Sequence, residues 1–481
     1  MSEPHRIGEF EWELPIGFVD GMNVPGRIFA SQALFDKALE DRAAEQVANV
    51  ATLPGIVAAS YAMPDIHWGY GFPIGGVAAT DPADGGVLSP GGVGFDIGCG
   101  IRLMRTDLTR SDLEGSLRAL VDALERHVPR GIGGLGRLKL KGDEIDRVLT
   151  EGVPYVIERG AGWEDDAEAC EDLGTLPDAD ASRVSERAKE RGRSQLGSLG
   201  SGNHFLEVQV VDQLRDESAA QVLGLAENQV CVMIHSGSRG VGHQTCTDYL
   251  RTIDTLGDQF GYVPPDRQLA CAPLDHELAD DYRRAMNACG NYALANRQVL
   301  MDGVRRAFEF TFRRSPRELG MQLVYDVAHN LAKLEQHSIA GTTRTVCVHR
   351  KGATRAFGPS HPNLPERYRT TGQPVLVPGS MGTASFVLIG TDEAAGLSFS
   401  STCHGAGRAM SRTKAKKQMT GEDLREQLEA EGIVLAKTRW KALSEEAPYA
   451  YKDAEEVVGT CEGAGLSRVV ARLRPVGVVK G

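Results

Sequence analysis

Apolar residues recur at helical spacing in several long segments of the chain. Leu39, Ala43 and Val47 follow one another every four residues, which is the spacing of one face of a helix. The leucines between residues 113 and 124 repeat at three and four, and Pro129 marks the end of that pattern. Helices are therefore predicted over residues 24–53, 111–127, 275–312 and 421–431.

Shorter apolar runs, bounded by glycine, proline and aspartate, indicate strands. They lie at 229–234, 345–349, 374–377, 384–389, 397–402 and after 469, and residues 55–106 contain several more. Strands and helices do not alternate regularly. This arrangement favours an α+β fold, in which helices flank a mixed β-sheet core. We expect one large domain, 1–481, with an exposed acidic insertion near residues 164–181.

Composition narrows the class of protein. With 41% hydrophobic and 25% charged residues, the chain is typical of globular proteins and not of fibrous or disordered ones. No apolar run approaches the roughly 18 residues of a membrane span, and no signal peptide is recognisable, so a cytoplasmic protein without a membrane partner is expected. The net charge of −12 argues against a general DNA coat. Nine cysteines without a C-x-x-C pair predict reduced thiols.

Glycine is concentrated in one part of the chain. Residues 69–100 contain 11 of the 56 glycines. Glycine lets the backbone approach a ligand closely, although such a run is also typical of a flexible linker. The interleaved apolar residues, together with Asp96 and Cys99, favour a ligand-binding loop.

Four histidines stand in unusual surroundings. His235 and His404 each follow an apolar run and precede small residues, while His204 and His329 are each next to an asparagine. Together with Asp96 and Cys99, the histidines at 204, 235 and 329 (His204, His235 and His329) would provide five metal ligands. A bridging thiolate could then hold two divalent ions, for which these donors suit Mn²⁺, Zn²⁺ or Fe²⁺. On the pattern alone, a single histidine in a strand is more often a satisfied core residue than a metal ligand.

His404 precedes Gly405-Ala406-Gly407, and a helix is expected to begin near Arg408. A helix N-terminus binds phosphate, and a neutral imidazole there could attack phosphorus. A capping or metal-binding histidine is an equally good interpretation of the pattern. The loop 378–383 also suits phosphate binding, or is a plain turn. No Walker A, kinase or G-x-S-x-G motif is present.

Taken together, these segments resemble the RtcB family of RNA-splicing ligases over nearly the whole chain. The motifs that carry the resemblance are VPGR (24–27), MPDIH (63–67), GYGFPIGG (69–76), SPGGVGFDIGCG (89–100), GNHFLE (202–207), HSGSRG (235–240), AHN (328–330), HRKGA (349–353), PGSMG (378–382), CHGAGR (403–408) and VVKG (478–481).

The resemblance implies a ligase that uses GTP and two Mn²⁺ ions. It would join RNA ending in a 3′-phosphate or 2′,3′-cyclic phosphate to RNA with a 5′-hydroxyl, in tRNA splicing or RNA repair. An archease-type activating protein is a further partner that the resemblance raises, and the sequence does not decide whether one is needed.

The resemblance also implies residue roles. Asp96, Cys99 and His204 match the ligands of one metal, and Cys99, His235 and His329 match those of the other. His404 matches the histidine that becomes guanylylated. Arg239 and Arg408 resemble binders of RNA phosphate. The positions that match guanylate contacts are Asn203, His204, Phe205, Leu206, Glu207, His329, Asn330, Pro378, Gly379, Ser380, Met381, Ser385, His404, Gly405, Ala406, Gly407, Tyr451 and Lys480.

Hydrogen-bonding chemistry is consistent with a guanine site. Lys480 could donate to guanine O6, Glu207 could accept from the guanine N–H groups, and Tyr451 could pack on the ring. By its position alone, Lys480 would instead be a frayed terminal residue. Two other functions remain open: a dinuclear metallophosphoesterase that opens cyclic phosphates, and a nucleotide-responsive RNA-binding protein.

Overall fold

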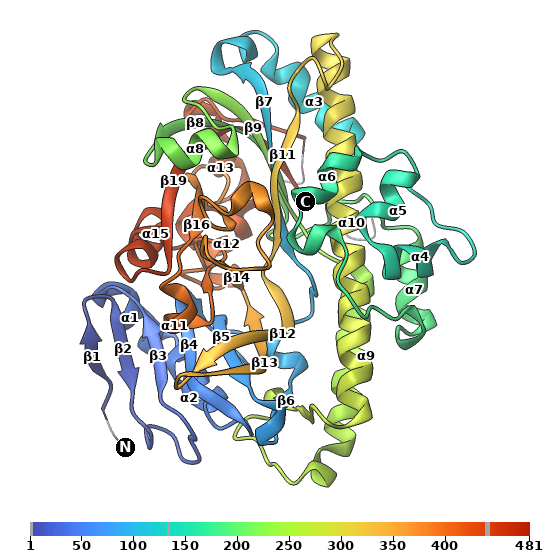
Figure 1. Cartoon of the computed structure of the whole chain (residues 1–481). Helices are drawn as coiled ribbons and strands as arrows, with labels where there is room; N and C mark the ends of the chain where they lie inside the picture. Colours follow the sequence, from blue (N-terminus) through green and yellow to red (C-terminus); the bar gives the residue numbers. More distant parts are fainter. Residues whose placement is uncertain (1–2, 132–134, 438–442) are drawn as a thin grey trace.

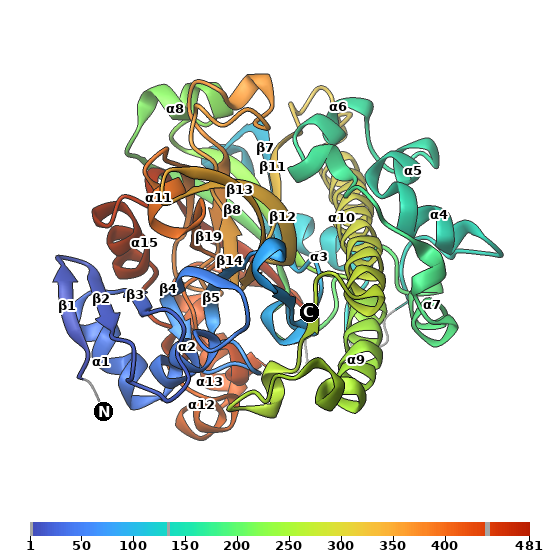
Figure 2. The same ribbon diagram turned by 60° about the horizontal axis from the view of Figure 1, so that its bottom comes forward.

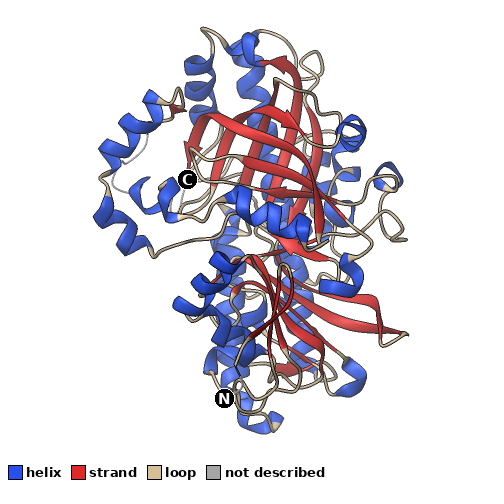
Figure 3. Cartoon of the chain, turned by 90° about the vertical axis from the view of Figure 1, so that its left-hand side faces the viewer, coloured by secondary structure: helices blue, strands red, loops and turns tan. Residues whose placement is uncertain are grey.

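Two large β-sheets form the centre of the fold, and Figure 3 shows them one above the other. The computed structural model describes residues 3–131, 135–437 and 443–481. The N-terminal sheet has the strand order β1 (His5–Gly8), β2 (Glu11–Leu14), β3 (Gly26–Phe29), β4 (Ile56–His67), β5 (Ile74–Thr80), β13 (Thr342–Lys351) and β12 (Asn330–Ile339). The central sheet has the order β11 (Gln322–Ala328), β7 (Gly100–Thr109), β9 (Gln229–Ser236), β8 (Phe205–Leu214), β19 (Ser467–Lys480), β16 (Ser385–Gly390) and β15 (Pro374–Val377), and β18 (Val434–Leu435) pairs with β19.

Both sheets are mixed. All pairs are antiparallel except β3 with β4 and β18 with β19. Two further sheets have two short strands each: β6 (Val87–Leu88) pairs with β10 (Ala272–Pro273), and β14 (Ala353–Arg355) pairs with β17 (Ser401–Cys403).

The register of the central sheet brings functional residues to one end. His235 on β9 lies opposite Ile101 on β7 and Phe205 on β8. Cys99 immediately precedes β7, and His204 immediately precedes β8. His329 is the single residue between β11 of the central sheet and β12 of the N-terminal sheet. Four of the five predicted metal ligands therefore lie at one end of the central sheet, at or next to the ends of its strands.

Helices cover the outside of both sheets (Figures 1 and 2). They are α1 (Gln32–Glu40), α2 (Ala43–Val50), α3 (Leu117–His127), α4 (Glu144–Glu151), α5 (Val153–Glu158), α6 (Glu164–Glu168), α7 (Glu186–Arg193), α8 (Glu217–Leu223), α9 (Arg239–Leu256), α10 (Glu277–Phe312), α11 (Ala394–Ser398), α12 (Arg412–Gln418), α13 (Gly421–Ala430) and α15 (Ala454–Gly463). At about 1.5 Å per residue, α10 is roughly 54 Å long. Its middle is buried on all sides, and it packs against α3, α4 and α9.

The predicted α+β class with a mixed-sheet core is confirmed, although two large sheets share that core. The predicted strand 374–377 coincides with β15, and the predicted helix 275–312 is α10. The single helix predicted over 24–53 is wrong. That segment begins with β3, and the left-handed backbone of Arg42 separates α1 from α2. Part of the predicted strand 397–402 belongs to α11. Among the described residues, no helix is long and apolar enough to cross a membrane.

The acidic segment 164–181 is not simply exposed, contrary to the prediction. Asp166 is buried and accepts two hydrogen bonds of 2.7 Å from Arg305. Glu171 is buried too and pairs with Lys333 at 2.6 Å. Cations distant in sequence compensate these carboxylates, which explains why an acidic run can enter the core.

Candidate functional site

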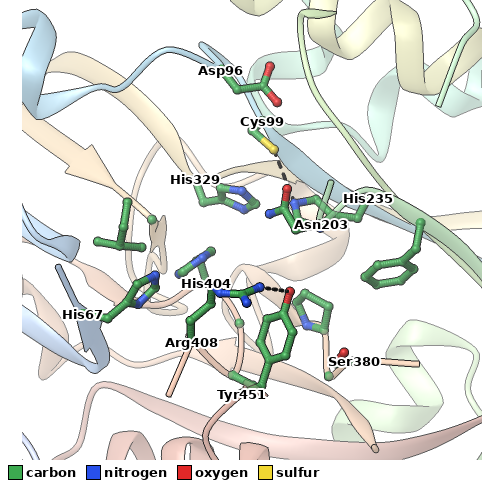
Figure 4. Close-up of a pocket in the computed structure, with 18 of the residues that line it drawn as sticks. His67, Asp96, Cys99, Asn203, His235, His329, Ser380, His404, Arg408 and Tyr451 are labelled. Atoms are coloured by element: carbon green, nitrogen blue, oxygen red, sulfur yellow. Dashed lines mark hydrogen bonds between the residues drawn. The ribbon is translucent and has the colours of Figure 1, made fainter. Parts of the chain in front are cut away.

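A cavity of about 430 Å³ lies where the two sheets meet, and it contains most of the predicted functional residues (Figure 4). Its walls combine strand ends of the central sheet with loops from the second half of the chain. The predicted residues that line it are Asp96, Cys99, Asn203, Phe205, His235, His329, Asn330, Pro378, Gly379, Ser380, His404, Gly405, Ala406, Gly407, Arg408, Tyr451 and Lys480.

Cys99, His204 and His235 form a compact cluster of metal-binding atoms. The Cys99 Sγ atom lies 3.4 Å from Nε2 of His204 and 3.3 Å from Nε2 of His235. One ligand atom from each residue fits within 4.8 Å of the others. Nδ1 of His204 lies 3.0 Å from the Leu199 carbonyl, which leaves Nε2 facing the thiol. Such an outer hydrogen bond is the usual way to orient a ligating histidine.

Asp96 and His329 extend this cluster on two sides. The Asp96 carboxylate lies 2.9 Å from Nε2 of His204. The His329 ring centroid lies 5.3 Å from that of His235. Nδ1 of His329 is buried without any hydrogen-bond partner among the described residues. A buried nitrogen without a partner is costly, so a ligand for it is expected.

Burial sets the protonation of these groups. Burial lowers the pKa of His235 and of His329 well below the usual value, so both imidazoles are neutral, which is the metal-binding form. Burial also raises the pKa of the Cys99 thiol well above its usual value. For Asp96, burial opposes ionisation, but the hydrogen bond and charge of His204 outweigh it and lower the pKa to about 2.

A buried arginine on α10 holds the ligand-bearing turns. Arg297 donates to the carbonyls of Gly98 at 2.8 Å and Ser236 at 2.9 Å, which are neighbours of Cys99 and His235. Its other nitrogens pair with Asp326 of β11 at 2.7–3.0 Å. The α10 helix is thus tied to the metal-ligand end of the central sheet.

His404 is positioned by a buried carboxylate that sequence reasoning did not identify. Nδ1 of His404 lies 2.5 Å from Oδ2 of Asp65, near the end of β4. The same oxygen accepts the backbone N–H groups of His404 at 3.0 Å and Gly405 at 3.3 Å. Burial would raise the pKa of Asp65, but the charge and hydrogen bonds of His404 outweigh this and lower it. Nδ1 thus faces the carboxylate as a close ion-pair contact without hydrogen-bond geometry, and Nε2 is the nitrogen left for chemistry.

The chain after His404 is a loop, and the helix predicted to begin near Arg408 is wrong in position. The helix α12 begins at Arg412, after the cap residue Ser411. The helix that follows His404 in the sequence therefore begins eight residues beyond it. The loop instead packs on Asp65: Gly407 has φ +71°, and a Cβ atom there would lie 2.3 Å from the Asp65 carbonyl oxygen. Only glycine permits both this backbone conformation and this close approach.

Lys452 contacts both the end of β4, which carries Asp65, and the loop that follows His404. Its Nζ donates to the carbonyls of Pro64, at 3.2 Å, and Ile66, which flank Asp65. Its backbone N–H donates to the Gly407 carbonyl at 2.9 Å. The strand that carries Asp65 and the loop that carries His404 therefore share one buried cation.

Glu207, Gln209 and Ser385 form a polar group behind the cavity wall. Gln209 donates to Glu207 Oε2 at 2.8 Å and to Ser385 Oγ at 2.9 Å. The Ser385 hydroxyl also accepts from the Gly379 N–H at 3.1 Å. Oε1 of Glu207 is buried and has no partner among the described residues. Burial raises the pKa of Glu207 to about 7.

Lys480 is buried, not frayed, because it belongs to β19 and pairs with Phe205 of β8. Its ammonium lies 5.6 Å from the centroid of the Phe205 ring. Burial lowers the pKa of Lys480, while the carboxylates of Glu446 and Glu207 oppose that shift. A cation and an incompletely paired carboxylate thus lie near one end of β8.

The two predicted phosphate-binding arginines have different surroundings. The Arg408 guanidinium pairs with Glu446 at 3.1 Å and lies 5.1 Å above the Tyr451 ring (Figure 4). Arg239 is half-buried, and its Nη1 lies 3.3 Å from Nδ1 of His204. Arg408 lines the cavity, whereas Arg239 lies beside it.

The structure both limits and extends the predicted site. The side chains of His204, Leu206, Glu207, Met381, Ser385 and Arg239 lie outside the cavity lining. Leu206 and Met381 pack into hydrophobic clusters. The lining residues that the sequence analysis did not select are His67, Trp68, Ile74, Gly352 and Arg412. The signal for His67 was present, since it ends the MPDIH motif together with Asp65.

Comparison with known proteins identifies the family. The family model described as "tRNA-splicing ligase RtcB" matches residues 46–481. The chain belongs to the RtcB family. It is similar to the tRNA-splicing ligase RtcB of Methanococcus maripaludis, with 50% identity over 476 residues and 99% of both chains. It is also similar to that of Archaeoglobus fulgidus, with 51% identity over 99% of this chain and 98% of the relative. The RNA-splicing ligase RtcB of Mycobacterium tuberculosis is 52% identical over 91% of this chain and 100% of its own. The resemblance to this family seen in the sequence motifs is confirmed.

Proposed function

We propose that this RtcB-family protein is a GTP- and Mn²⁺-dependent RNA ligase that acts through a guanylylated His404. It would join a 3′-phosphate or 2′,3′-cyclic phosphate end to a 5′-hydroxyl end, in tRNA splicing or RNA repair. The observation that carries the proposal is the pair of His404 and Asp65. A histidine held by Nδ1 at 2.5 Å from a buried carboxylate, and free at Nε2, is arranged as a nucleophile.

Nε2 of His404 would attack the α-phosphorus of GTP. The N–P bond forms as the bond to the bridging oxygen breaks, and pyrophosphate leaves. The Asp65 carboxylate keeps the remaining ring proton on Nδ1 and stabilises the positive charge that develops on the ring. The guanylate then passes to the RNA 3′-phosphate, and the 5′-hydroxyl displaces GMP. Water must first open a cyclic phosphate end.

The residues present fit a pair of Mn²⁺ ions. Asp96, Cys99 and His204 would hold one ion, and Cys99, His235 and His329 the other. The mixed oxygen, nitrogen and sulfur donors suit Mn²⁺, and the unpaired Nδ1 of buried His329 gives a second reason to expect an ion. When bound, the ions would neutralise charge on phosphate oxygens.

The guanine specificity would come from Glu207 and Lys480. Oε1 of Glu207 lacks a partner and could accept from the guanine N–H groups, while Lys480 could donate to O6. A buried polar pair of this kind discriminates strongly, because adenine would leave both groups unsatisfied.

The test is covalent labelling with α-labelled GTP and Mn²⁺, followed by a denaturing gel. We expect an adduct that acid removes and alkali does not, as for a phosphoramidate. His404→Ala should abolish both the adduct and ligation but keep Mn²⁺ binding largely intact. Undiminished labelling of that variant would exclude His404 as the nucleophile. Hydrolysis of cyclic phosphates without any adduct would instead favour the metallophosphoesterase, which has no use for His404 or its Asp65 partner.

A further inference from the structure

Phe310 is an exposed aromatic residue surrounded by cations, far along α10 from the metal ligands. Its relative exposure is 47%. Among the Phe, Trp and Tyr residues that the structure describes, the other exposed one is Trp68, which lines the cavity. The guanidinium carbons of Arg313 and Arg126 lie 5.1 Å and 5.9 Å from the centroid of the Phe310 ring. Phe310 also lines a shallow pocket with His127, Arg306, Glu309, Arg313, Arg314 and Ser315.

We call Arg126, His127, Arg306, Phe310, Arg313 and Arg314 the arginine patch. Within the described chain, no carboxylate lies within 4.0 Å of the guanidinium of Arg126, Arg313 or Arg314, whereas Arg306 pairs with Asp302 at 3.0 Å. Glu309 lines the same pocket and Glu318 lies near Arg314, so these carboxylates and the partial charge of about −0.5 at the helix C-terminus offset part of the charge of the three cations. On a chain of net charge −12, this surplus is a local feature.

Contacts through α3 connect the arginine patch to the C-terminal strand that lines the cavity. Figure 1 shows the C-terminal end of α10 beside α3. A Cβ at Gly303 of α10 would lie 2.7 Å from the His127 carbonyl, so Phe310 is two turns, about 10 Å, beyond that level. Three residues after His127, Arg130 donates to the Lys480 carbonyl at 3.3 Å. The path from Phe310 to Lys480 is therefore on the order of 25 Å.

We propose that the arginine patch binds single-stranded RNA of the substrate, several nucleotides away from the reacting end. A base would stack on Phe310, and neighbouring phosphates would contact Arg126, Arg313 and Arg314. A path of 25 Å corresponds to at most roughly seven nucleotides, the number for a stacked strand at about 3.4 Å per phosphate, and to fewer for an extended single strand. This inference rests on the proposed RNA-ligase function only in taking RNA as the substrate.

The chemistry favours a nucleic acid over a protein partner. Arginines around an exposed aromatic ring combine phosphate contacts with base stacking, as in proteins that bind single strands. A stable protein interface buries about 800 Å² on each partner around an apolar centre. Phe310 is the one large apolar side chain of the arginine patch, which is too little for such a centre.

The test measures the affinity of labelled RNA ending in a 3′-phosphate for the full-length protein by fluorescence anisotropy. The RNA is either about 2 or about 20 nucleotides long, so that the short RNA cannot reach the arginine patch even when it is extended, whereas the long RNA can even when it is stacked at about 3.4 Å per phosphate. Phe310→Ala should weaken binding of the long RNA about fivefold or more, the lower end for loss of base stacking, and leave the short RNA unchanged. Phe310→Trp should restore the wild-type affinity because it keeps the stacking face.

Variants of the arginines test the proposed contacts with RNA phosphates. The double variant Arg313→Glu/Arg314→Glu should weaken the long RNA further and reduce the salt slope by about 1.4, or about 0.7 for each of the two phosphates that the variant no longer neutralises. Its matched control is Arg367→Glu/Arg369→Glu, which makes the same charge change at two exposed arginines elsewhere, one of them also stacked on an aromatic ring.

Wild-type affinity of Phe310→Ala for the long RNA would overturn the proposal. Equal weakening by the control pair would overturn it as well, because net charge alone would then explain the effect. A change of oligomeric state without a change in RNA affinity would make the patch a protein interface. Guanylylation needs no RNA and should be unchanged in all these variants. Failure of the wild type to form the adduct would contradict the proposed function. The RNA affinities of the variants would still show whether the arginine patch binds RNA.

Discussion

The metal-ligand half of the cavity and the half around His404 are held in place by different means. Cys99, His204 and His235 adjoin or end neighbouring antiparallel strands, so sheet register fixes their spacing. His404 lies on a loop, and its position depends on hydrogen bonds to Asp65 from a different sheet. A ligand cluster needs fixed distances, whereas the nucleophile proposed here would need one defined ring orientation. Each half has the support that its task requires.

The largest loss is expected in the metal-ligand half. Cys99→Ala should cost more Mn²⁺ binding than Asp96→Ala or His329→Ala, because the thiolate would serve both ions. Titration by calorimetry or EPR measures the stoichiometry. Two intact sites in the Cys99 variant would exclude a bridging thiolate. Since the free thiol has a raised pKa, Mn²⁺ binding should also release a proton.

The next largest effect is expected in the half of the cavity around His404. Asp65→Asn keeps the volume, but its amide can donate to Nδ1 and so place the ring proton on Nε2. Guanylylation should then slow by about 100-fold or more, as expected for the wrong tautomer. Single-turnover labelling gives the rate, and Mn²⁺ titration should remain as in the wild type. A normal rate would mean that Asp65 only supports the loop.

A third variant tests whether α10 supports the metal-ligand half. Arg297→Met removes one of the two fully buried arginines that pair with Asp326. Arg102 remains at 2.6 Å, so the loss of unfolding free energy should be near the lower end of the usual range, about 3 kcal/mol. Arg305→Met is the matched control, since Arg305 is also buried on α10 and pairs with Asp166. Denaturant unfolding should show comparable losses. Only Arg297→Met should weaken Mn²⁺ binding, because only Arg297 contacts the Gly98 and Ser236 carbonyls.

The smallest effect is expected in the pH dependence of GTP affinity at the proposed guanine site. Burial raises the pKa of Glu207 to about 7, so the carboxylate that would accept guanine N–H groups in the proposed site forms as pH rises through 7. GTP affinity should therefore increase by up to about tenfold from pH 6 to pH 8, since each pH unit changes the ionised fraction up to tenfold below the pKa. Glu207→Gln should flatten this dependence. For stability the sign is opposite: the protonated folded state loses stability as pH rises from about 4.5 to 7.

Sequence reasoning reached the metal-ligand half more fully than the half around His404. The spacing of Asp96 and Cys99, and histidines at strand ends, are local signals. The partner of His404 is 339 residues away, and Arg297 lies in the middle of a helix whose pattern indicates only burial. Family resemblance mostly selected residues that line the cavity, and it did not select Asp65 or Arg297, which contact lining residues or their neighbours from outside.

The same limit explains the errors in the fold. Residues 164–181 look exposed because their compensating cations, Arg305 and Lys333, are more than a hundred residues away. The helix expected near Arg408 begins four residues later because Asp65 holds the preceding turn. The strand 374–377 and the helix 275–312 were predictable because burial alone determines their patterns.

His329, as the only residue between β11 and β12, joins the two sheets in the wall of the cavity. A ligand held by Cys99 and His235 on one side, and by the loop near Asp65 on the other, binds only when the two sheets are docked. By mass action it stabilises the docked state over any state in which one sheet has separated. Calorimetry should therefore show one sharper, later melting transition when nucleotide and Mn²⁺ are present. Occupancy of the cavity would thus make the unfolding of the two sheets a single cooperative event.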